Sequence, residues 1–240
     1  IRDNESFGVV KPTICIVEIM GRHAGWLTAA ASLAKSDDCS GVDAIYLPEE
    51  DFDLDEFLDR VKKLAMTKSS VVIAVSEGIK TKDGKFVCEL ENDNKKTDAF
   101  GHKQLSGCAV TLANIISKNM DYKTRAIEFS TLQRAASHIS SLTDINEALT
   151  VGEEAVKAMN DGNTAVMIVM KRSKDKKYKI TYDYYDIHQI ANVENMIPTS
   201  WIDTKNKQMK EEYLNYVRPL IMGELNPIYK NGLPSHLVRK

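Results

Sequence analysis

Three segments of the sequence carry charged side chains at positions where a strand is expected to end. In the first, an apolar run continues through Met20, Gly21 and Arg22 into a helix that begins near Gly25. Glycine allows the backbone to approach a ligand closely, and arginine offers a planar cation suited to phosphate. The free amide groups of a helix start also favour anions. The segment therefore indicates either an anion site or a surface arginine beside an ordinary strand-to-helix turn.

The second segment places Glu77 and Gly78 directly after an apolar run. A carboxylate in that position can accept hydrogen bonds from the hydroxyl groups of a sugar. The same residue can equally cap a turn or face solvent, as most glutamates do. Taken alone, the segment favours the solvent-facing interpretation.

The third segment, residues 124–134, contains two arginines. Arg125 begins an expected strand, and Arg134 lies beyond its end. At roughly 3.3 Å per residue, they cannot be neighbours on one extended strand. One or both must therefore serve another surface or another subunit, unless they are surface charges whose stems cover apolar neighbours.

Apolar runs of strand length alternate with helical patterns along the chain, and this alternation supplies the scaffold for the three segments. The expected strands are residues 14–20, 42–47, 71–76, 124–129, 164–170 and 179–185. The expected helices are residues 25–35, 54–66, 107–119 and 144–159. The pattern predicts an α/β fold with a doubly wound, mostly parallel sheet, and the continuous apolar strands indicate cover on both faces.

Local signals refine the ends of these elements. Asp144 is followed by Glu147 at the spacing of a capping box, so the last helix should begin at Asp144 and end near Gly162. The lysine-dense residues 171–179 predict a solvated hairpin turn rather than a nucleic-acid site. The acidic residues 49–56 predict a solvated loop and a helix start.

Composition excludes several classes of protein. The chain has 240 residues, of which 43% are apolar and 28% charged, as in ordinary globular proteins. Its 32 basic and 34 acidic residues give a net charge of −2, so no broad grip on nucleic acid or an anionic membrane is expected. The apolar runs are too short to cross a bilayer and no signal pattern is present, which favours the cytoplasm. The cysteines lack the spacing of a metal site and are expected to be reduced: Cys15, Cys39, Cys88 and Cys108.

Together, the three segments resemble the 6-phosphofructokinase family, in the branch whose members use pyrophosphate or ATP. Residues 17–27 are similar to that family's Met-Gly-Arg substrate motif, with the His-Ala-Gly-Trp extension of pyrophosphate and mixed-donor members. Glu77 matches the family's fructose-binding glutamate. Arg125 and Arg134 match its paired phosphate-contacting arginines, at the spacing of the short bacterial enzymes. The resemblance covers nearly the whole chain.

The resemblance implies a role for each matching residue. Met20 and Gly21 would contact the sugar, and Arg22 would also face the transferring phosphoryl group as the transition-state cation. Glu77 would hold sugar hydroxyls, and Arg134 would hold the 6-phosphate. Arg125 would reach the substrate of a neighbouring subunit, which implies a homo-oligomer, a dimer or a tetramer.

Some positions depart from the family pattern. Thr131 stands where the short bacterial enzymes carry a phosphate-contacting histidine, and it can offer a hydrogen bond to substrate but no charge. Thr13 replaces a second intersubunit arginine, with Lys11 nearby as a substitute. His102 lies in a stretch similar to the family's Asp-x-Phe-Gly-His and is expected to be structural.

The implied reaction is a transferase step of glycolysis, in which pyrophosphate or ATP phosphorylates the 1-hydroxyl of fructose 6-phosphate to give fructose 1,6-bisphosphate. Mg²⁺ is implied with the donor, and no metal ligand is predicted in this chain. The family's Gly-rich donor loop and its Thr-Ile-Asp-Asn-Asp segment, which supplies the catalytic base, are absent. Because residue 1 is Ile1 rather than methionine, we expect a carboxy-terminal part of a longer protein. Because the base and the donor loop are absent, we expect this part to be inactive alone.

The family's path predicts two similar α/β domains, the first of them truncated. Residues 1–134 would form the fructose 6-phosphate domain, residues 135–200 a returning part of the donor domain, and residues 201–240 a helix and tail packing back on the substrate domain. Two alternatives stay open. One is a non-catalytic sugar-phosphate or nucleotide-binding regulatory domain, for which Arg2, Asp3, Asp43 and Lys68 would converge on one nucleotide. The other is a structural subunit of a catalytic partner chain.

Overall fold

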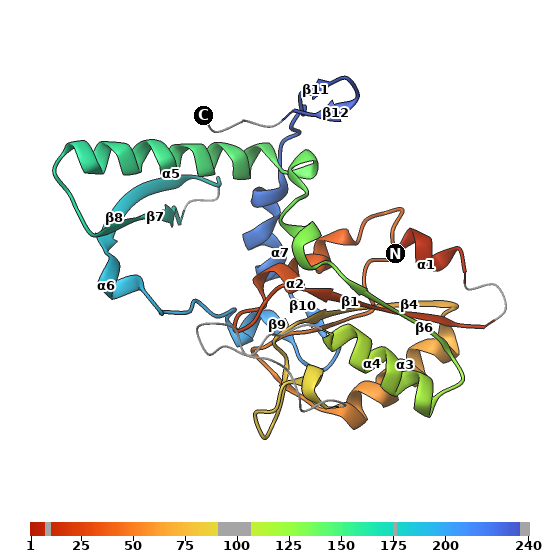
Figure 1. The fold of residues 1–240 in the computed structure, drawn as a ribbon. Helices are drawn as coiled ribbons and strands as arrows, with labels where there is room; N and C mark the ends of the chain where they lie inside the picture. Colours follow the sequence, from red (N-terminus) through yellow and green to blue (C-terminus); the bar gives the residue numbers. More distant parts are fainter. Residues whose placement is uncertain (8–10, 91–106, 175–176, 236–240) are drawn as a thin grey trace. The chain divides into compact units, whose positions relative to one another are not determined.

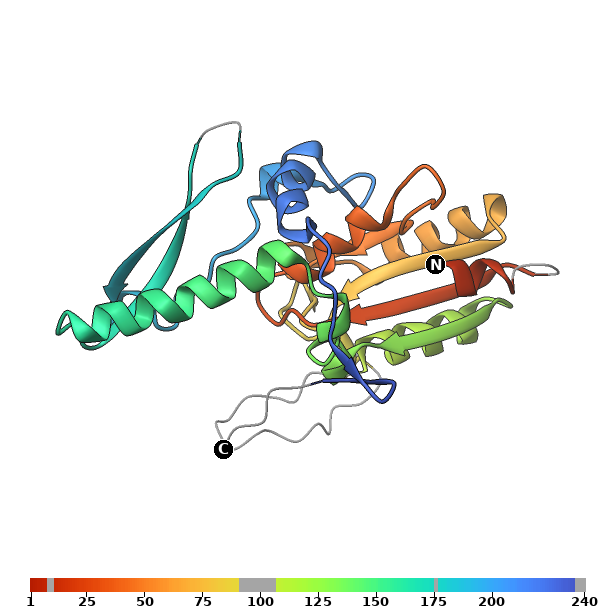
Figure 2. The ribbon, with the colours of Figure 1, turned by 90° about the horizontal axis from the view of Figure 1, so that it is seen from above.

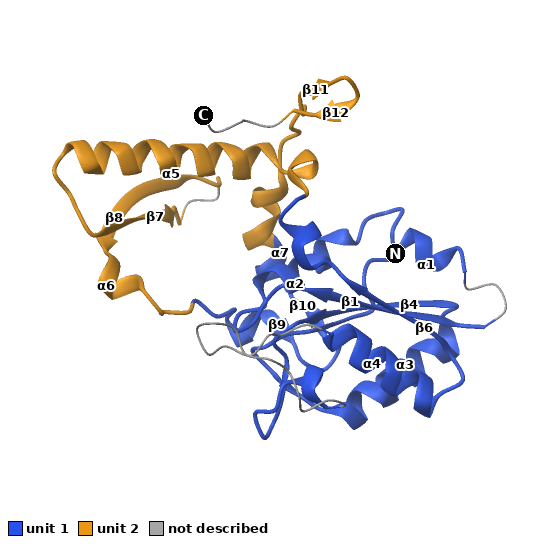
Figure 3. Cartoon of the chain, viewed as in Figure 1, with its two compact units in different colours: residues 1–135, 195–214 blue, residues 136–194, 215–240 orange. Residues whose placement is uncertain are grey.

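The chain divides into two compact units. The computed structural model describes residues 1–7, 11–90, 107–174 and 177–235. Unit 1 comprises residues 1–135 and 195–214, and unit 2 comprises residues 136–194 and 215–240 (Figure 3). The segment 201–240, expected as one piece, is thus divided between the units. What each unit does stays a prediction.

Unit 1 is built on a four-stranded parallel sheet with strand order β2-β4-β1-β6 (Figure 1). The strands are β1 (Thr13–Ile19), β2 (Ala44–Tyr46), β4 (Ser70–Ser76) and β6 (Lys123–Glu128). Figure 2 shows β4, β1 and β6 running side by side in one direction. The predicted α/β fold with a parallel sheet is therefore confirmed.

Helices lie on both faces of this sheet. In Figure 1, α3 (Leu54–Thr67) and α4 (Cys108–Asn119) lie on one side, and α1 (Arg2–Glu5) and α2 (Trp26–Ala29) on the other. The core is a cluster of strand and helix side chains that includes Ile16, Ile73, Phe57 and Leu112, all with 0% exposure. Burying each such side chain contributes about 1.5–3 kcal/mol.

Smaller elements complete unit 1. The short strands are β3 (Asp51–Phe52), parallel to β5 (Lys80–Thr81), and β9 (Ile202–Asp203), antiparallel to β10 (Gln208–Met209). The 3₁₀ helices are Ala30–Ala34, Val87–Glu89, Ser130–Gln133 and Thr199–Trp201. Within the predicted helix at 25–35, residues 26–29 are thus α-helical and residues 30–34 form a 3₁₀ helix. In the second part the Ser32 hydroxyl donates to the Ala29 carbonyl at 2.6 Å, a local bond that competes with helical pairing.

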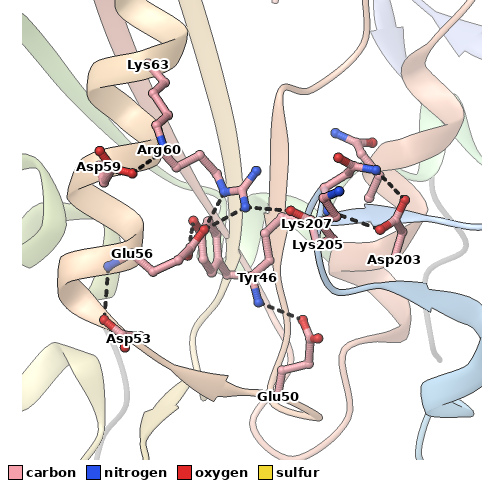
Figure 4. A network of polar contacts seen from close by, with 12 residues as sticks. Tyr46, Glu50, Asp53, Glu56, Asp59, Arg60, Lys63, Asp203, Lys205 and Lys207 are labelled. Carbon is pink, nitrogen blue, oxygen red and sulfur yellow. Dashed lines mark hydrogen bonds and ion pairs between the residues drawn. The ribbon is translucent and has the colours of Figure 1, made fainter.

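A polar network fastens residues 203–208 to the sheet and to α3 (Figure 4). The Lys207 carbonyl accepts from the Ile45 amide at 2.8 Å, and the Lys207 ammonium pairs with Glu50 at 3.2 Å. Arg60 donates to the Lys205 carbonyl at 2.8 Å and pairs with Glu56 at 2.6 Å. This part of the chain therefore belongs to unit 1 although it is far away in sequence.

Unit 2 consists of a long helix, a hairpin and short elements. They are α5 (Leu142–Asn160), β7 (Val166–Arg172), β8 (Ile180–Asp186), α6 (Ile187–Ile190), β11 (Tyr229–Lys230), β12 (Leu233–Pro234) and 3₁₀ helices at Ser137–Ile139 and Arg218–Ile221. The helix α7 (Glu211–Val217) begins in unit 1 and ends in unit 2.

Two predictions for unit 2 are wrong. Ser141, not Asp144, caps α5: its hydroxyl accepts from the Asp144 amide at 3.1 Å, and the helix starts at Leu142. The cover on both faces expected for the strand at 164–170 is also wrong, because β7 is only partly buried. The hairpin expected around residues 171–179 is confirmed, since β7 pairs antiparallel with β8. The connection between β7 and β8 is too short for a crossover and allows only a hairpin.

Apolar side chains are exposed along unit 2. On α5 the exposed fractions are 63% for Leu149, 54% for Val156 and 64% for Met159, and on β7 Met170 is 52% exposed. Ala158 is the one α5 side chain described as buried. In the described part of the chain, no helix has both the length and the apolar character needed to span a membrane.

Candidate functional site

The carboxyl ends of β4, β1 and β6 lie at one edge of the sheet of unit 1. Ile19 pairs with Ser76, and Glu18 pairs with Glu128, so three adjacent strands end together. The loops that follow begin at Met20, Glu77 and Phe129. Ligands of open α/β sheets collect at such an edge.

The loops after β1 and β4 are fastened to each other by main-chain bonds. The Glu77 amide donates to the Ile19 carbonyl at 3.1 Å, and the Gly78 amide donates to the Gly21 carbonyl at 3.1 Å. The Ser76 hydroxyl reaches the same Gly21 carbonyl at 2.9 Å. A Cβ atom on Gly78 would lie 1.8 Å from the Arg22 carbonyl oxygen, so only glycine fits there. These contacts hold Arg22 and Glu77 on neighbouring loops.

Glu49 holds the start of α2. Its carboxylate accepts from the Gly25 amide at 2.9 and 3.2 Å and from the Ile197 amide at 3.1 Å. The prediction that residues 49–56 form a merely solvated acidic run is therefore wrong at this position. Farther along the run, Asp53 caps α3 by accepting from the Glu56 amide at 3.0 Å, as the helix-start interpretation predicted.

Aromatic rings pack around Trp26, the first residue of α2, the helix that follows the Arg22 loop. The Trp26 ring centroid lies 5.9 Å from that of Tyr213, nearly stacked, and 6.3 Å from that of Trp201, edge to face. Tyr213 donates its hydroxyl to the Trp26 carbonyl at 2.6 Å. Burial raises the pKa of the Tyr213 phenol, and the nearby Glu49 charge raises it further. These contacts attach residues 195–214 to the helix that follows the Arg22 loop.

The loop after β6 is fastened to the Arg22 loop by a side chain. The Phe129 amide donates to the Glu18 carbonyl at 3.1 Å and continues the strand pairing by one bond. After one 3₁₀ turn, the Gln133 side-chain oxygen accepts from the Met20 amide at 3.1 Å. Thr131 and Arg134, on either side of Gln133, are exposed. Sequence reasoning missed Gln133, because a lone amide in a loop carries no pattern.

The predicted site residues Met20, Gly21, Arg22, Glu77, Thr131 and Arg134 therefore follow three strands that end at one edge. Arg22 and Glu77 are half-buried, and Arg134 is exposed. Two guanidinium groups suit phosphate oxygens, and a carboxylate suits hydroxyl donors. This combination is able to bind a molecule that carries both phosphate and hydroxyl groups.

Arg125 is placed elsewhere. It pairs in register with Cys15, four residues before Ile19, which is about 13 Å from the end of β1. Its guanidinium pairs with the Asp3 carboxylate at 2.8 Å and lies 4.8 Å from the Phe7 ring centroid. The structure of one chain therefore does not bring Arg125 to the sheet edge that carries the other candidates.

The residues weighed for a regulatory site form separate ion pairs. Arg2 pairs with Asp38 at 3.0 Å, and Asp3 pairs with Arg125. Lys68 pairs with Asp43, whose carboxylate also accepts from the Val72 amide at 2.8 Å. Lys11, the expected substitute for a substrate-binding arginine, pairs with Asp121.

The remaining candidates are possible metal ligands, the cysteines and His102. Within residues 1–7, 11–90, 107–174 and 177–235, no three His, Cys, Asp or Glu side chains are grouped to hold a metal ion. All four cysteines lie in these ranges and none forms a disulfide, and burial raises the pKa of the Cys15 thiol. His102 and its stretch lie outside the described residues.

Comparison with known proteins gives a consistent result. Residues 7–159 match a family described as phosphofructokinase. The chain is 38% identical to the pyrophosphate–fructose 6-phosphate 1-phosphotransferase of Halomonas elongata over 97% of its length, and 36% identical to that of Methylococcus capsulatus over 98%. It covers 55% of each of these proteins, so it spans about half the length of the curated relatives it matches.

Solved structures agree with the sequence matches. A pyrophosphate-dependent phosphofructokinase from Nitrosospira multiformis superposes with a TM-score of 0.81 and 31% identity, covering 98% of this chain and 55% of that chain. One from Marinobacter aquaeolei superposes with a TM-score of 0.80 and 29% identity, covering 100% of this chain and 57% of that chain.

Proposed function

The chain belongs to the phosphofructokinase family, and we propose that it supplies the fructose 6-phosphate site of a phosphotransferase. The reaction would move a phosphoryl group from pyrophosphate to the 1-hydroxyl of the sugar phosphate, giving fructose 1,6-bisphosphate. The observation that carries the proposal is the joining of the Arg22, Glu77 and Arg134 loops at one sheet edge. We propose pyrophosphate rather than ATP as the donor because the names of similar proteins specify it.

Each loop has a task in this proposal. Arg134 holds the 6-phosphate with Thr131 beside it, and Glu77 accepts hydrogen bonds from sugar hydroxyls. Met20 and Gly21 shape the loop against the sugar. Arg22 faces the phosphoryl group in transfer, where a preorganised cation stabilises the charge that develops on its oxygens.

Mg²⁺ is part of the proposal only as a companion of the donor. In the described ranges no group of acidic or histidine side chains is arranged to cage a cation, so this part of the chain does not fit a metal site. We therefore assign no residue of this chain to the metal. The donor loop and the catalytic base of the family are not among these 240 residues, and we propose that the chain alone does not turn over substrate.

Arg125 would serve a second subunit. In one chain it is held by Asp3 and Phe7, far along β6 from the sheet edge. In a homo-oligomer, this arginine would bind the sugar phosphate in the site of a neighbouring subunit. We propose such an assembly, with the cytoplasm as its location.

A chimaeric enzyme tests the proposal directly. This chain would replace the matching 55% of the Halomonas elongata relative, and fructose 1,6-bisphosphate formation would be assayed with pyrophosphate and with ATP. We expect activity with pyrophosphate and little with ATP. A folded chimaera that binds no fructose 6-phosphate would contradict the assignment, and one that prefers ATP would overturn the donor.

A further inference from the structure

We infer that Gln133 is a positioning residue that sets the spacing between the Met20-Gly21-Arg22 loop, which faces the sugar, and the loop of Arg134, which holds the 6-phosphate. The inference rests on the proposed function of this site. It adds a specificity-determining residue that touches no substrate and acts through the Met20 amide.

The position of Gln133 joins two separate loops. It is the last residue of the 3₁₀ helix Ser130–Gln133 and directly precedes Arg134. Its side-chain oxygen accepts from the Met20 amide at 3.1 Å, and Met20 is separated from Arg22 by one residue. A single side chain therefore links the segment that carries one cation to the segment that carries the other.

The bond from the Met20 amide to Gln133 lies just beyond the end of the pairing between β1 and β6. Strand pairing between β1 and β6 stops at Glu18 and Glu128, and the Phe129 amide adds one more main-chain bond to Glu18. Beyond that point the chain after β6 turns away into the 3₁₀ helix. Gln133 then accepts from the Met20 amide, the next amide of the Arg22 loop. Had the strand pairing continued, this amide would have donated to the main chain of β6.

The other side of the same loop is held independently. The Gly21 carbonyl accepts from the Gly78 amide at 3.1 Å and from the Ser76 hydroxyl at 2.9 Å. The Met20-Gly21 segment is thus fastened to the loop after β4 by main-chain and hydroxyl groups, and to the loop after β6 by Gln133. Loss of Gln133 frees the loops on one side only.

The chemistry of the ligand makes this spacing matter. Fructose 6-phosphate has its phosphate at one end and its reactive hydroxyl at the other, so it must engage both loops at once. Inorganic phosphate engages only the Arg134 loop. A preset spacing between the loops avoids the ordering cost of bringing them together, and this gain applies only to a ligand that spans both.

The test compares two ligands and two glutamine variants. Gln133→Met keeps the side-chain length and removes the acceptor. Gln208→Met is the control, because Gln208 also bonds main chain, donating to the Val42 and Asp43 carbonyls at 3.0 Å, at a place outside the proposed site. The whole chain would be titrated with fructose 6-phosphate and with inorganic phosphate, by calorimetry and by NMR.

We expect Gln133→Met to weaken fructose 6-phosphate binding by about fivefold to tenfold and to leave phosphate binding unchanged. Hydrogen exchange of the Met20 amide should become faster. Gln208→Met should lower the thermal midpoint and leave both affinities unchanged. A Gln133→Met chain that binds fructose 6-phosphate like wild type, or that loses phosphate affinity in parallel, overturns the spacing role alone. A wild-type chain that binds neither ligand refutes the proposed function, and the inference with it.

Discussion

At the residue scale, the two arginines of the proposed site differ in exposure. Arg134 is exposed on the loop after β6, as a group that captures a phosphate from solvent must be. Arg22 is half-buried beside a loop whose carbonyl and amide groups are bonded to the next strand end. The first position suits ground-state binding, and the second suits a preorganised cation that acts during transfer.

Replacing Arg134 should therefore affect sugar-phosphate binding. In the chimaeric enzyme, Arg134→Ala should raise the KM for fructose 6-phosphate by about 10- to 100-fold, the value of a charge-assisted hydrogen bond, with the donor KM nearly unchanged. Arg218→Ala, a change at an exposed arginine of unit 2, is the matched control. An unaltered sugar-phosphate KM in Arg134→Ala would remove the assignment.

Replacing Arg22 should have a kinetic signature instead. Arg22→Ala should lower kcat and kcat/KM together by about 100-fold or more, because the interaction is made mainly in the transition state. Arg22→Lys should recover part of the rate, since it keeps the charge and loses the planar fork. Steady-state kinetics decide the matter: a raised KM with a normal kcat would mean that Arg22 only binds substrate.

At the scale of elements, the site depends on how closely the main chains of two neighbouring loops approach each other. The loops after β1 and β4 touch at Gly78, where no Cβ atom can be accommodated against the Arg22 main chain. This contact, the Glu49 bonds to Gly25 and Ile197, and the Gln133 bond together shape the sheet edge. The site is thus made rigid by neighbours that do not themselves contact the ligand in the proposal.

A pair of glycine substitutions checks this reasoning. Gly78→Ala should reduce the free energy of unfolding by about 1–3 kcal/mol, because the obstructing atoms belong to the main chain. Gly152→Ala meets nothing within 4 Å on α5 and should raise it by about 0.5–1 kcal/mol. Urea unfolding followed by circular dichroism gives both values. If Gly78→Ala proved as stable as wild type, the close approach would not be real.

Sequence patterns predicted the elements of unit 1 better than its contacts. The apolar runs placed β1, β4 and β6 to within about a residue. The cover on both faces that these runs indicated holds for β1 and β4 but not for β6, whose residues are exposed or only partly buried. The same rule failed for β7, whose apolar run lies in a hairpin. The residues that fasten the site, Glu49 and Gln133, follow no periodicity, since their partners are brought near only by the fold.

The two units differ in how they are stabilised at the scale of the whole molecule. Strands β1 and β4 are buried almost throughout, whereas β8 and α5 expose most of their side chains and β7 has no fully buried residue. Local opening free energy follows the amount of buried apolar contact. Unit 2 should therefore open more readily than unit 1 in the isolated chain.

Hydrogen–deuterium exchange measured by mass spectrometry tests this difference. Peptides from β1 and β4 should stay protected at least ten times longer than those from β7 and β8, a factor that corresponds to about 1.4 kcal/mol of opening free energy. Joining the chain to the rest of a chimaeric enzyme should slow exchange in unit 2 if the exposed apolar side chains become covered. Equal protection of both units in the isolated chain would contradict the expectation.

The packing of Trp26 has an optical consequence. The chain contains two tryptophans, and both lie in one ring cluster with Tyr213; Trp26 of this cluster begins the helix that follows the Arg22 loop. Light at the red edge of the absorption band, where tyrosine contributes little, therefore excites only the ring cluster around Trp26. The emission of the unlabelled chain reports on the surroundings of the helix that follows the proposed sugar-phosphate loop.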